Sequence, residues 1–203
     1  VFIVEDSLFA QVGESMAEMP NVAAWIWSRQ GSGAPAPEGF RDFDAWYAAY
    51  PAEEPEAVLR IEDPAQMTYT SGTESLPKGA MLTHESVIAQ YVSVMTAAEY
   101  SAADTMLHAM PLFHCAQLDT FFGPMLYNGA SNVITASPTP ESVLPKIGQF
   151  GITSLFAPPT VWIALLRSPL FDASKLKHLA KGYYGASIMP VEVLKELATR
   201  LPA

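Results

Sequence analysis

The segment that decides the fold of this chain reads Thr70-Ser71-Gly72-Thr73-Glu74-Ser75-Leu76-Pro77-Lys78-Gly79. It combines hydroxyl side chains, two glycines and one lysine within ten positions. Glycines let a backbone approach a ligand closely, and hydroxyl and amide groups donate hydrogen bonds to anionic oxygens. Lys78 adds a positive charge on a flexible stem. These residue types therefore indicate a loop that binds phosphate groups.

The spacing excludes two common phosphate-binding loops. A Walker A loop has the pattern G-x-x-x-x-G-K-[ST] and is followed at once by a helix. Here Lys78 precedes Gly79, and an apolar run, Ala80-Met81-Leu82, follows. The dinucleotide-binding pattern G-x-G-x-x-G is also absent from the chain. Composition alone leaves a plain alternative open, which is a Ser/Thr/Gly turn in a β-hairpin.

Together with the Thr83-His84 pair that follows the apolar run, this segment resembles the nucleotide-binding signature of the adenylate-forming enzymes. That superfamily contains acyl-CoA synthetases, firefly luciferase and the adenylation domains of peptide synthetases. Glu74-Ser75 stands where most members have Thr-Gly, a variant that looks like some fatty-acyl-CoA synthetases. The resemblance implies that Lys78 is a catalytic charge that neutralises leaving pyrophosphate. It also implies an ATP-binding role for Thr70, Ser71, Gly72, Thr73, Glu74, Ser75 and Lys78.

Composition bounds the class of protein. The chain has 203 residues, of which 50% are hydrophobic, so it can bury a core. Its formal charge of -10 argues against a nucleic-acid surface, and the acidic residues gather in 38–63, where we expect a solvated loop. No run approaches the roughly 18–20 uninterrupted apolar residues of a membrane span. Cys115 is the single cysteine, which excludes an intramolecular disulfide and suits a cytoplasmic location.

From Pro64 onward, apolar strands alternate with amphipathic helices. The pattern predicts strands at 67–70, 105–110, 131–135, 153–156 and 182–184, and helices at 86–100, 118–126, 141–150, 160–166 and from 190. This alternation implies an α/β fold with a mostly parallel, doubly wound sheet and flanking helices. Ligands of such a sheet lie beyond the carboxyl ends of its strands. The resemblance makes the sheet an incomplete part of a larger N-terminal domain.

The leading residues are less regular. They predict strands at 1–4 and 23–28, helices at 9–19 and 43–50, and a loop at 31–37. We therefore expect residues 1–63 to be a leading part with an acidic loop, and residues 64–203 to be a nucleotide- and acyl-binding core. Because the chain starts within a strand and ends on a helix, we expect a segment of a longer protein. The resemblance places the family's Tyr-Gly-x-Thr-Glu motif and its C-terminal lid domain outside these residues.

A second candidate site follows the strand predicted at 105–110. The sequence there reads Pro111-Leu112-Phe113-His114-Cys115-Ala116-Gln117. The superfamily has a similar aromatic or Leu-Phe-His segment, and the resemblance implies that Phe113 and His114 border the substrate carboxylate, with His114 as a catalytic residue. Cys115 lacks a recognisable environment that would lower its thiol pKa, so we expect it to be a buried small hydrophobe.

Two further segments resemble parts of the family's binding site. Gly182-Tyr183-Tyr184-Gly185-Ala186-Ser187 is similar to its Gly-Gly-Ala/Ser turn, which implies that Gly185, Ala186 and Ser187 contact adenine and the acyl group. The segment from Ala157 to Trp162 is similar to the lining of the acyl channel, which makes Trp162 a candidate substrate residue. His108 and His178 are expected to be surface or satisfied core residues.

The resemblance implies a two-step reaction that uses ATP, Mg²⁺ and coenzyme A: a carboxylate is activated as an acyl-adenylate and then converted to a thioester. The apolar candidates favour a fatty acid, with an aryl-CoA ligase as the alternative and a non-catalytic ATP- or acyl-binding fragment as a further one. A P-loop kinase is disfavoured because Lys78 precedes Gly79. No metal ligand is assigned within the chain. An exposed sheet edge would favour a homodimer.

Overall fold

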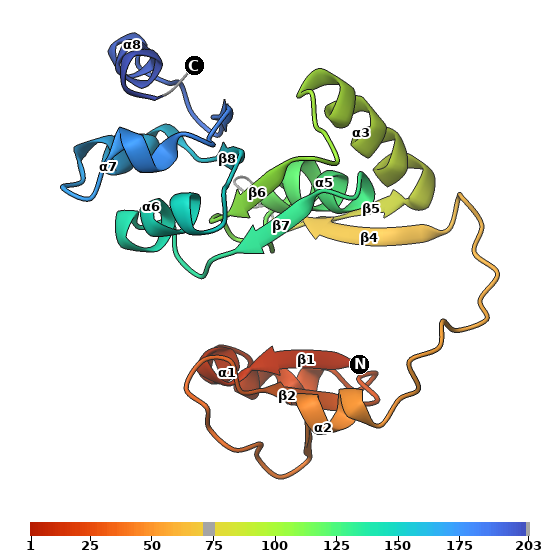
Figure 1. Cartoon of the computed structure of the whole chain (residues 1–203). Helices are drawn as coiled ribbons and strands as arrows, with labels where there is room; N and C mark the ends of the chain where they lie inside the picture. Colours follow the sequence, from red (N-terminus) through yellow and green to blue (C-terminus); the bar gives the residue numbers. More distant parts are fainter. Residues whose placement is uncertain (71–75, 202–203) are drawn as a thin grey trace. The chain divides into compact units, whose positions relative to one another are not determined.

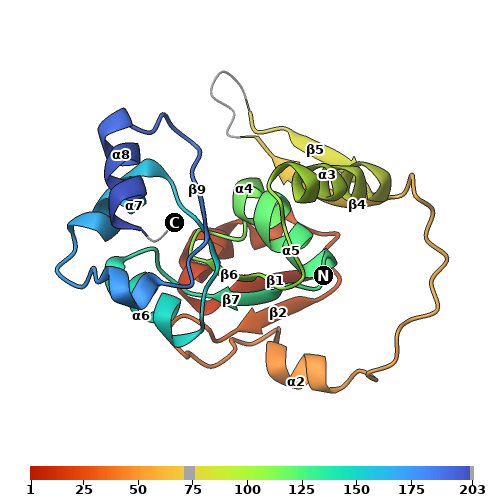
Figure 2. The ribbon, with the colours of Figure 1, turned by 45° about the horizontal axis from the view of Figure 1, so that its top comes forward.

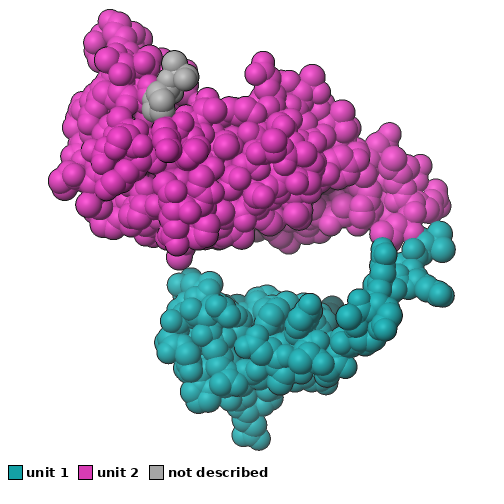
Figure 3. Space-filling model, viewed as in Figure 1, with its two compact units in different colours: residues 1–58 teal, residues 59–203 magenta. Residues whose placement is uncertain are grey.

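The computed structural model describes residues 1–70 and 76–201. The chain divides into two compact units, Val1–Val58 and Leu59–Ala203 (Figure 3). The sequence predicted a boundary between residues 63 and 64, and the division into compact units falls five residues earlier in the chain. The roles predicted for the two parts stay predictions. Each unit has its own strands and its own buried side chains, and each is described by itself.

The first unit is built on a small parallel sheet with the strand order β1-β2-β3. Aromatic side chains from the sheet and from α1 pack edge to face, for example Phe9 on Trp27 with ring centroids 5.2 Å apart. The single helix predicted at 9–19 is wrong, because a 3-10 helix starts at Gly13 where the α-helix ends. The elements are β1 (Phe2–Glu5), a 3-10 helix (Asp6–Leu8), α1 (Phe9–Val12), a 3-10 helix (Gly13–Glu18), β2 (Trp25–Ser28), β3 (Phe40–Asp42) and α2 (Phe43–Ala48).

The second unit opens with an antiparallel hairpin. Strand β4 (Pro64–Tyr69) pairs with β5 (Gly79–Thr83), and Tyr69 lies opposite Gly79. The strand predicted at 67–70 is confirmed, but its partner β5 was not predicted. The chain therefore does make a hairpin here, as composition alone allowed, and the signature segment connects its two strands.

The main sheet of the second unit is parallel and has the order β7-β6-β8-β9. Side chains alternate between its faces: Leu107 and Leu155 point into one core, and Met106 and Phe156 into the other. Both cores are covered by helices, as expected for a doubly wound α/β fold. The strands are β6 (Thr105–His108), β7 (Ser131–Ile134), β8 (Ser154–Phe156) and β9 (Lys181–Tyr183).

Helices cover both faces of this sheet (Figures 1 and 2). The larger core packs residues of α6, α7 and α8 on Leu107 and Leu155, and the smaller one packs Phe121 and Met125 on Met106 and Phe156. The segment predicted as a helix at 118–126 is helical throughout, but its first part is a π-helical turn that leads directly into α5. The elements are α3 (His84–Ala97), α4 (Cys115–Gln117), the π-helical turn (Leu118–Phe122), α5 (Gly123–Tyr127), α6 (Pro140–Gln149), α7 (Pro159–Arg167), a 3-10 helix (Ala173–Leu176) and α8 (Val191–Arg200).

One buried residue, Asp104, joins the amino ends of the four strands through its carboxylate and its backbone carbonyl. Asp104, immediately before β6, accepts hydrogen bonds from Lys181 Nζ at 2.7 Å and Thr153 Oγ1 at 3.1 Å, and its carbonyl accepts from the Ser131 amide at 3.0 Å. Ser131 and Lys181 begin β7 and β9, and Thr153 directly precedes β8. Asp104 is only 6% exposed. These contacts all lie at the amino ends of the strands. The loops that can hold a ligand lie at the opposite, carboxyl ends.

Candidate functional site

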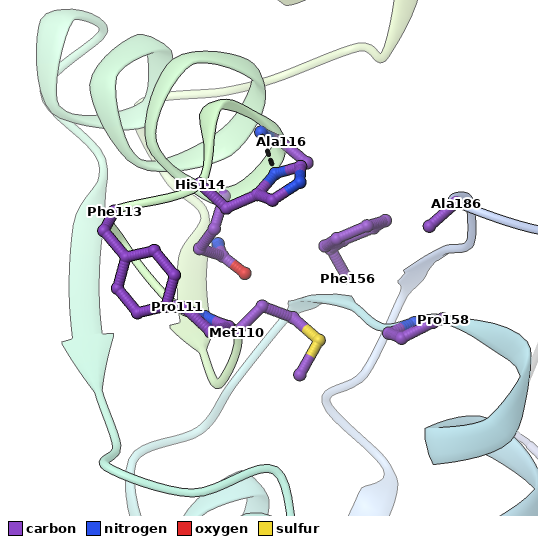
Figure 4. Close-up of a pocket in the computed structure, with 9 residues that line it drawn as sticks. Met110, Pro111, Phe113, His114, Ala116, Phe156, Pro158 and Ala186 are labelled. Atoms are coloured by element: carbon purple, nitrogen blue, oxygen red, sulfur yellow. Dashed lines mark hydrogen bonds between the residues drawn. The ribbon is translucent and has the colours of Figure 1, made fainter. Parts of the chain in front are cut away.

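An apolar cavity of about 160 Å³ lies beyond the carboxyl ends of β6 and β8. One wall comes from the loop after β6, with Met110 and His114, and the opposite wall comes from Phe156 and Pro158 at the end of β8. Ala186, in the loop after β9, completes it (Figure 4). This is the position that the sequence predicted for a ligand of a doubly wound sheet.

His114 is oriented by the helix that it begins. It is the N-cap of α4, and its Nδ1 accepts a hydrogen bond from the Ala116 amide at 3.1 Å. Since Nδ1 is an acceptor, the proton of the neutral imidazole lies on Nε2. Figure 4 shows the ring on the opposite side of the cavity from Phe156 and Ala186. His114 can therefore donate a hydrogen bond to an occupant of the cavity.

Phe113 and Cys115, on either side of His114, are both exposed. Phe113 is 91% exposed and lines the cavity as well as a neighbouring hollow of about 480 Å³ at the end of β7. The prediction that Cys115 is buried is wrong, since its thiol lies at the surface in the first turn of α4. Within α4 it is Gln117, two positions further on, that is turned into the core.

The loop after β9 contributes backbone to the cavity. Ala186 adopts a positive φ of 66°, a left-handed conformation that costs a non-glycine residue about 1 kcal/mol. A Cβ on Gly185 would lie 3.4 Å from the Phe156 ring, an ordinary contact distance, so the backbone runs beside that wall. Of the three residues predicted here, Ala186 lines the cavity, Gly185 packs behind it, and Ser187 is exposed.

Thr70 and Lys78, which flank the middle of the signature segment, lie where β4 ends and β5 begins. The Thr70 amide donates to the Lys78 carbonyl at 3.0 Å, and the Lys78 amide donates to Thr70 Oγ1 at 3.2 Å. These bonds bring the two ends of the predicted phosphate loop together. Its predicted central residues lie outside the described residues: Ser71, Gly72, Thr73, Glu74 and Ser75.

The hairpin is tied to the region that carries the cavity. Gln66 Nε2 on β4 donates to Asp119 Oδ2 at 3.0 Å. Asp119 belongs to the π-helical turn that continues from α4, whose N-cap is His114. The predicted phosphate loop and the predicted acyl site are therefore carried by elements that are hydrogen-bonded to each other.

Trp162 does not line this cavity. It is 3% exposed, its Nε1 donates to the Tyr183 carbonyl at 3.0 Å, and its ring lies 3.4 Å from where a Cβ on Gly182 would be. It borders a separate hollow of about 370 Å³ beside α8. The structure thus brings Phe113, His114 and Ala186 together but not Trp162, whose role in an acyl channel stays a prediction.

The sequence did not predict a buried polar network beneath the cavity. His108 is fully buried; its Nε2 lies 2.7 Å from Asn132 Oδ1, and its Nδ1 lies 2.6 Å from Gln117 Nε2. His108 was expected to be a surface or satisfied core residue, and it is a satisfied core residue. Gln117, also fully buried, lines the cavity. The only indication in the sequence that Gln117 belongs to the site was its position in the segment that contains Phe113 and His114.

The stability of this network depends on pH. Burial lowers the pKa of His108, and the hydrogen bond to Asn132 only partly opposes this effect. Between the lowered value and the ordinary value near 6.5, the unfolded chain binds more protons than the folded chain. The free energy of unfolding should therefore fall as the pH drops below about 6.5. Urea denaturation at several pH values, with a titration of the His108 ring by NMR, measures this.

The exposed His178 provides the control for this pH effect. A His178→Gln variant should lose stability below pH 6.5 to the same extent as the wild type. In the folded wild type, the His108 ring should stay neutral over the pH range of this loss. An imidazole of His108 that takes up its proton at the ordinary value would contradict the prediction.

Two further properties concern metal ions and membranes. Among residues 1–70 and 76–201, no group of three His, Cys, Asp or Glu side chains comes together as a metal-binding cluster. Within the same residues, no helix is both long and apolar enough to cross a membrane.

Residues 4–203 match the family model for AMP-binding enzymes. A feruloyl-CoA synthase from Amycolatopsis is 29% identical over 73% of this chain and 30% of its own length. A putative acyl-CoA synthetase, YngI, from Bacillus subtilis is 34% identical over 66% of this chain and 25% of its own length. The chain thus spans less than a third of the length of these relatives.

The fold is also found among solved structures. An anthranilate CoA ligase, AuaEII, in complex with anthranoyl-AMP superimposes with a TM-score of 0.83 at 21% identity. The similarity covers 98% of this chain and 38% of that one. It confirms the α/β fold with parallel strands and flanking helices.

Proposed function

This chain belongs to the family of AMP-binding enzymes, and from that premise we propose that the protein carrying it is an acid–thiol ligase. It activates a hydrophobic carboxylic acid with ATP and transfers the acyl group to coenzyme A. The observation that carries this proposal is the apolar cavity at the carboxyl ends of β6 and β8, bordered by the imidazole of His114.

In the first step a carboxylate oxygen attacks the α-phosphorus of ATP, and the bond to the β-phosphate oxygen breaks. Negative charge grows on the leaving pyrophosphate, so preorganised donors near it stabilise the transition state. Lys78 and Thr70, paired at the end of the hairpin, are the described residues that we assign to this task. Mg²⁺ would accompany the phosphates, and the described residues show no cluster that would hold it alone.

In the cavity, His114 Nε2–H donates to the acid's carboxylate or its adenylate oxygen, while Met110 and Phe156 surround the apolar part. In the second step the sulfur of coenzyme A attacks the acyl carbon and the bond to AMP breaks. Phe113, exposed between the cavity and its neighbouring hollow, lies on a route by which the thiol can approach.

The class of acid was predicted to be fatty, with aryl acids as the alternative. The named relatives support a hydrophobic acid in either class: a feruloyl-CoA synthase on one side and a putative acyl-CoA synthetase on the other. The proposed function therefore includes both classes. A homodimer and a cytoplasmic location remain predictions from the sequence.

Exchange of labelled pyrophosphate into ATP tests the proposal, with the full-length protein and a panel of alkyl and aryl acids. We expect exchange only when an acid is present, and thioester formation on addition of coenzyme A. ATP binding without exchange for any acid would instead support a non-catalytic binding protein. Hydrolysis of ATP without an acid would support a nucleotide hydrolase.

A further inference from the structure

A glutamine of β4 joins the β4–β5 hairpin to the π-helical turn and is held in a single orientation. Gln66 Nε2 donates to Thr68 Oγ1 at 3.1 Å and to Asp119 Oδ2 at 3.0 Å. Because a carboxylate only accepts hydrogen bonds, the amide nitrogen of Gln66 must be the atom that faces Asp119. Both amide hydrogens are thereby used, which fixes the plane of the Gln66 side chain against the turn.

The turn that receives this hydrogen bond also contacts the cavity. Two residues after Asp119, the Phe121 ring stacks on Phe156 with centroids 4.2 Å apart and an interplanar angle of 19°. Phe156 forms one wall of the cavity, and His114, on the other wall, is the N-cap of the helix that leads into the turn. A movement of the hairpin relative to Asp119 is therefore a movement relative to both walls.

The hydrogen bond lies next to a point where the hairpin can bend. The pairing of β4 with β5 has a register shift between Pro64 and Gln66, and strands bend at such irregularities. From Gln66 onward the pairing is regular up to Tyr69, which lies opposite Gly79. Thr70 follows four residues after Gln66, about 13 Å along an extended chain, so a tilt of roughly 5° at Gln66 would move Thr70 by about 1 Å.

The pair of Gln66 and Asp119 is better suited to fixing a position than to stabilising the fold. Among the described residues, Asp119 Oδ1 is buried and has no hydrogen-bond partner. A buried oxygen without a partner costs free energy, and an apolar pair of similar shape in its place is often neutral or stabilising. What an apolar pair would lack is the directed hydrogen bond between the hairpin and the turn.

We infer that Gln66 and Asp119 are positioning residues for the first step, because their hydrogen bond aligns the phosphate donors of the hairpin with the carboxylate in the cavity. In that step the carboxylate oxygen must meet the α-phosphorus while Lys78 and Thr70 stabilise the leaving pyrophosphate. A misplacement of about 1 Å can lower a rate by about 10²-fold. This inference rests on the proposed function and adds two residues to its machinery.

Four variants of the full-length protein test the inference, and a fifth is the control. Gln66→Met and Asp119→Leu each remove the hydrogen bond at similar side-chain size, and the double variant removes both partners. Asp119→Asn keeps an acceptor for Gln66. Tyr100→Phe is the matched control, because Tyr100 Oη donates to the Thr120 carbonyl of the same turn at 2.9 Å but does not lie on the hairpin.

The first readout is pyrophosphate exchange, measured as kcat and as KM for an acid that supports it, beside the melting temperature. Gln66→Met and Asp119→Leu should lower kcat by about 10–100-fold and change KM by less than about twofold. The double variant should lose no more kcat than either single variant, since all three lack the same bond, and should melt no lower than they do. Asp119→Asn should stay within about threefold of the wild type, and Tyr100→Phe should keep the wild-type kcat.

The second readout does not depend on activity. Spin labels are attached to Cys115, which is exposed in the first turn of α4, and to a Lys78→Cys substitution, with cysteines outside this chain replaced. Electron paramagnetic resonance then measures the distribution of distances between the hairpin and the cavity. This distribution should be broader or shifted in Gln66→Met and Asp119→Leu, and unchanged in Asp119→Asn and Tyr100→Phe.

The two readouts separate the inference from the proposed function. If no acid supports exchange but the label distances change as expected, the proposed function fails and the positioning role stands. If exchange occurs and Gln66→Met and Asp119→Leu keep their kcat, or if Tyr100→Phe loses as much kcat as they do, the inference is overturned. Label distances that stay unchanged in both variants overturn it as well, with or without exchange.

Discussion

Replacing Lys78 with alanine is expected to lower kcat/KM for pyrophosphate exchange by about 10²–10³, the usual effect of removing one preorganised group at a developing charge. The side chain is exposed, and its backbone amide and carbonyl, which bond to Thr70, are kept in the variant. The melting temperature should therefore change little. Exchange kinetics at saturating acid, together with thermal denaturation, measure the two effects.

Lys195 offers the control for this variant. It is an exposed lysine on α8 that pairs with Glu192 at 2.9 Å, and Lys195→Ala should leave both exchange and melting near the wild-type values. If Lys78→Ala lost activity and stability in equal measure, Lys78 would be a structural residue and its assignment to pyrophosphate would be wrong.

Replacing Asp104 with alanine is expected to lower the free energy of unfolding by about 3 kcal/mol, the lower end for removal of one partner of a buried ion pair. The variant leaves Lys181 Nζ, a quarter exposed, without its carboxylate, and removes the acceptor of Thr153 Oγ1. Urea denaturation of wild type and variant measures this loss. The control is Asp172, which lies 3.7 Å from Lys175 and caps the 3-10 helix at Ala173 by accepting from Ser174, and Asp172→Ala should cost about 1 kcal/mol.

The contribution of Asp104 also has a pH dependence. Burial alone raises the pKa of Asp104, but hydrogen bonds from Lys181, Ser101 and Thr153 outweigh it and hold the pKa below its usual value. The stabilisation is thus complete above the unfolded value near 3.8 and is lost as the pH falls through the folded one. Equal losses for Asp104→Ala and Asp172→Ala at pH 7 would contradict the buried role.

The sequence predicted the main sheet well because its strands are short apolar runs between helices of clear period. Strands β6, β7 and β8 lie within the ranges expected at 105–110, 131–135 and 153–156. Strand β5 was not predicted, because Ala80-Met81-Leu82 has no alternation of polar and apolar residues and follows a turn that had been assigned to phosphate binding.

The sequence predicted residues of the site only where these residues are neighbours in the chain. Phe113 and His114 stand in one motif, and the structure places both at the cavity. The network of His108, Gln117 and Asn132 depends on pairing between β6 and β7, which brings together residues that are 24 positions apart. The spacing of residues within one short segment does not indicate such a contact between two strands.

The position of Asp104 has a consequence for the order in which the chain can fold. Its partners lie at 131, 153 and 181, so each strand that joins β6 becomes available only after the previous one has been made. At a synthesis rate of roughly 5–20 residues per second, Lys181 leaves the ribosome several seconds after Asp104. During that interval the carboxylate lacks its ammonium partner, although Ser101 and later Thr153 can donate to it, whereas the β4–β5 hairpin, whose strands are neighbours in the chain, can close at once. The last contact of Asp104 thus reports that all four strands of the main sheet are in place.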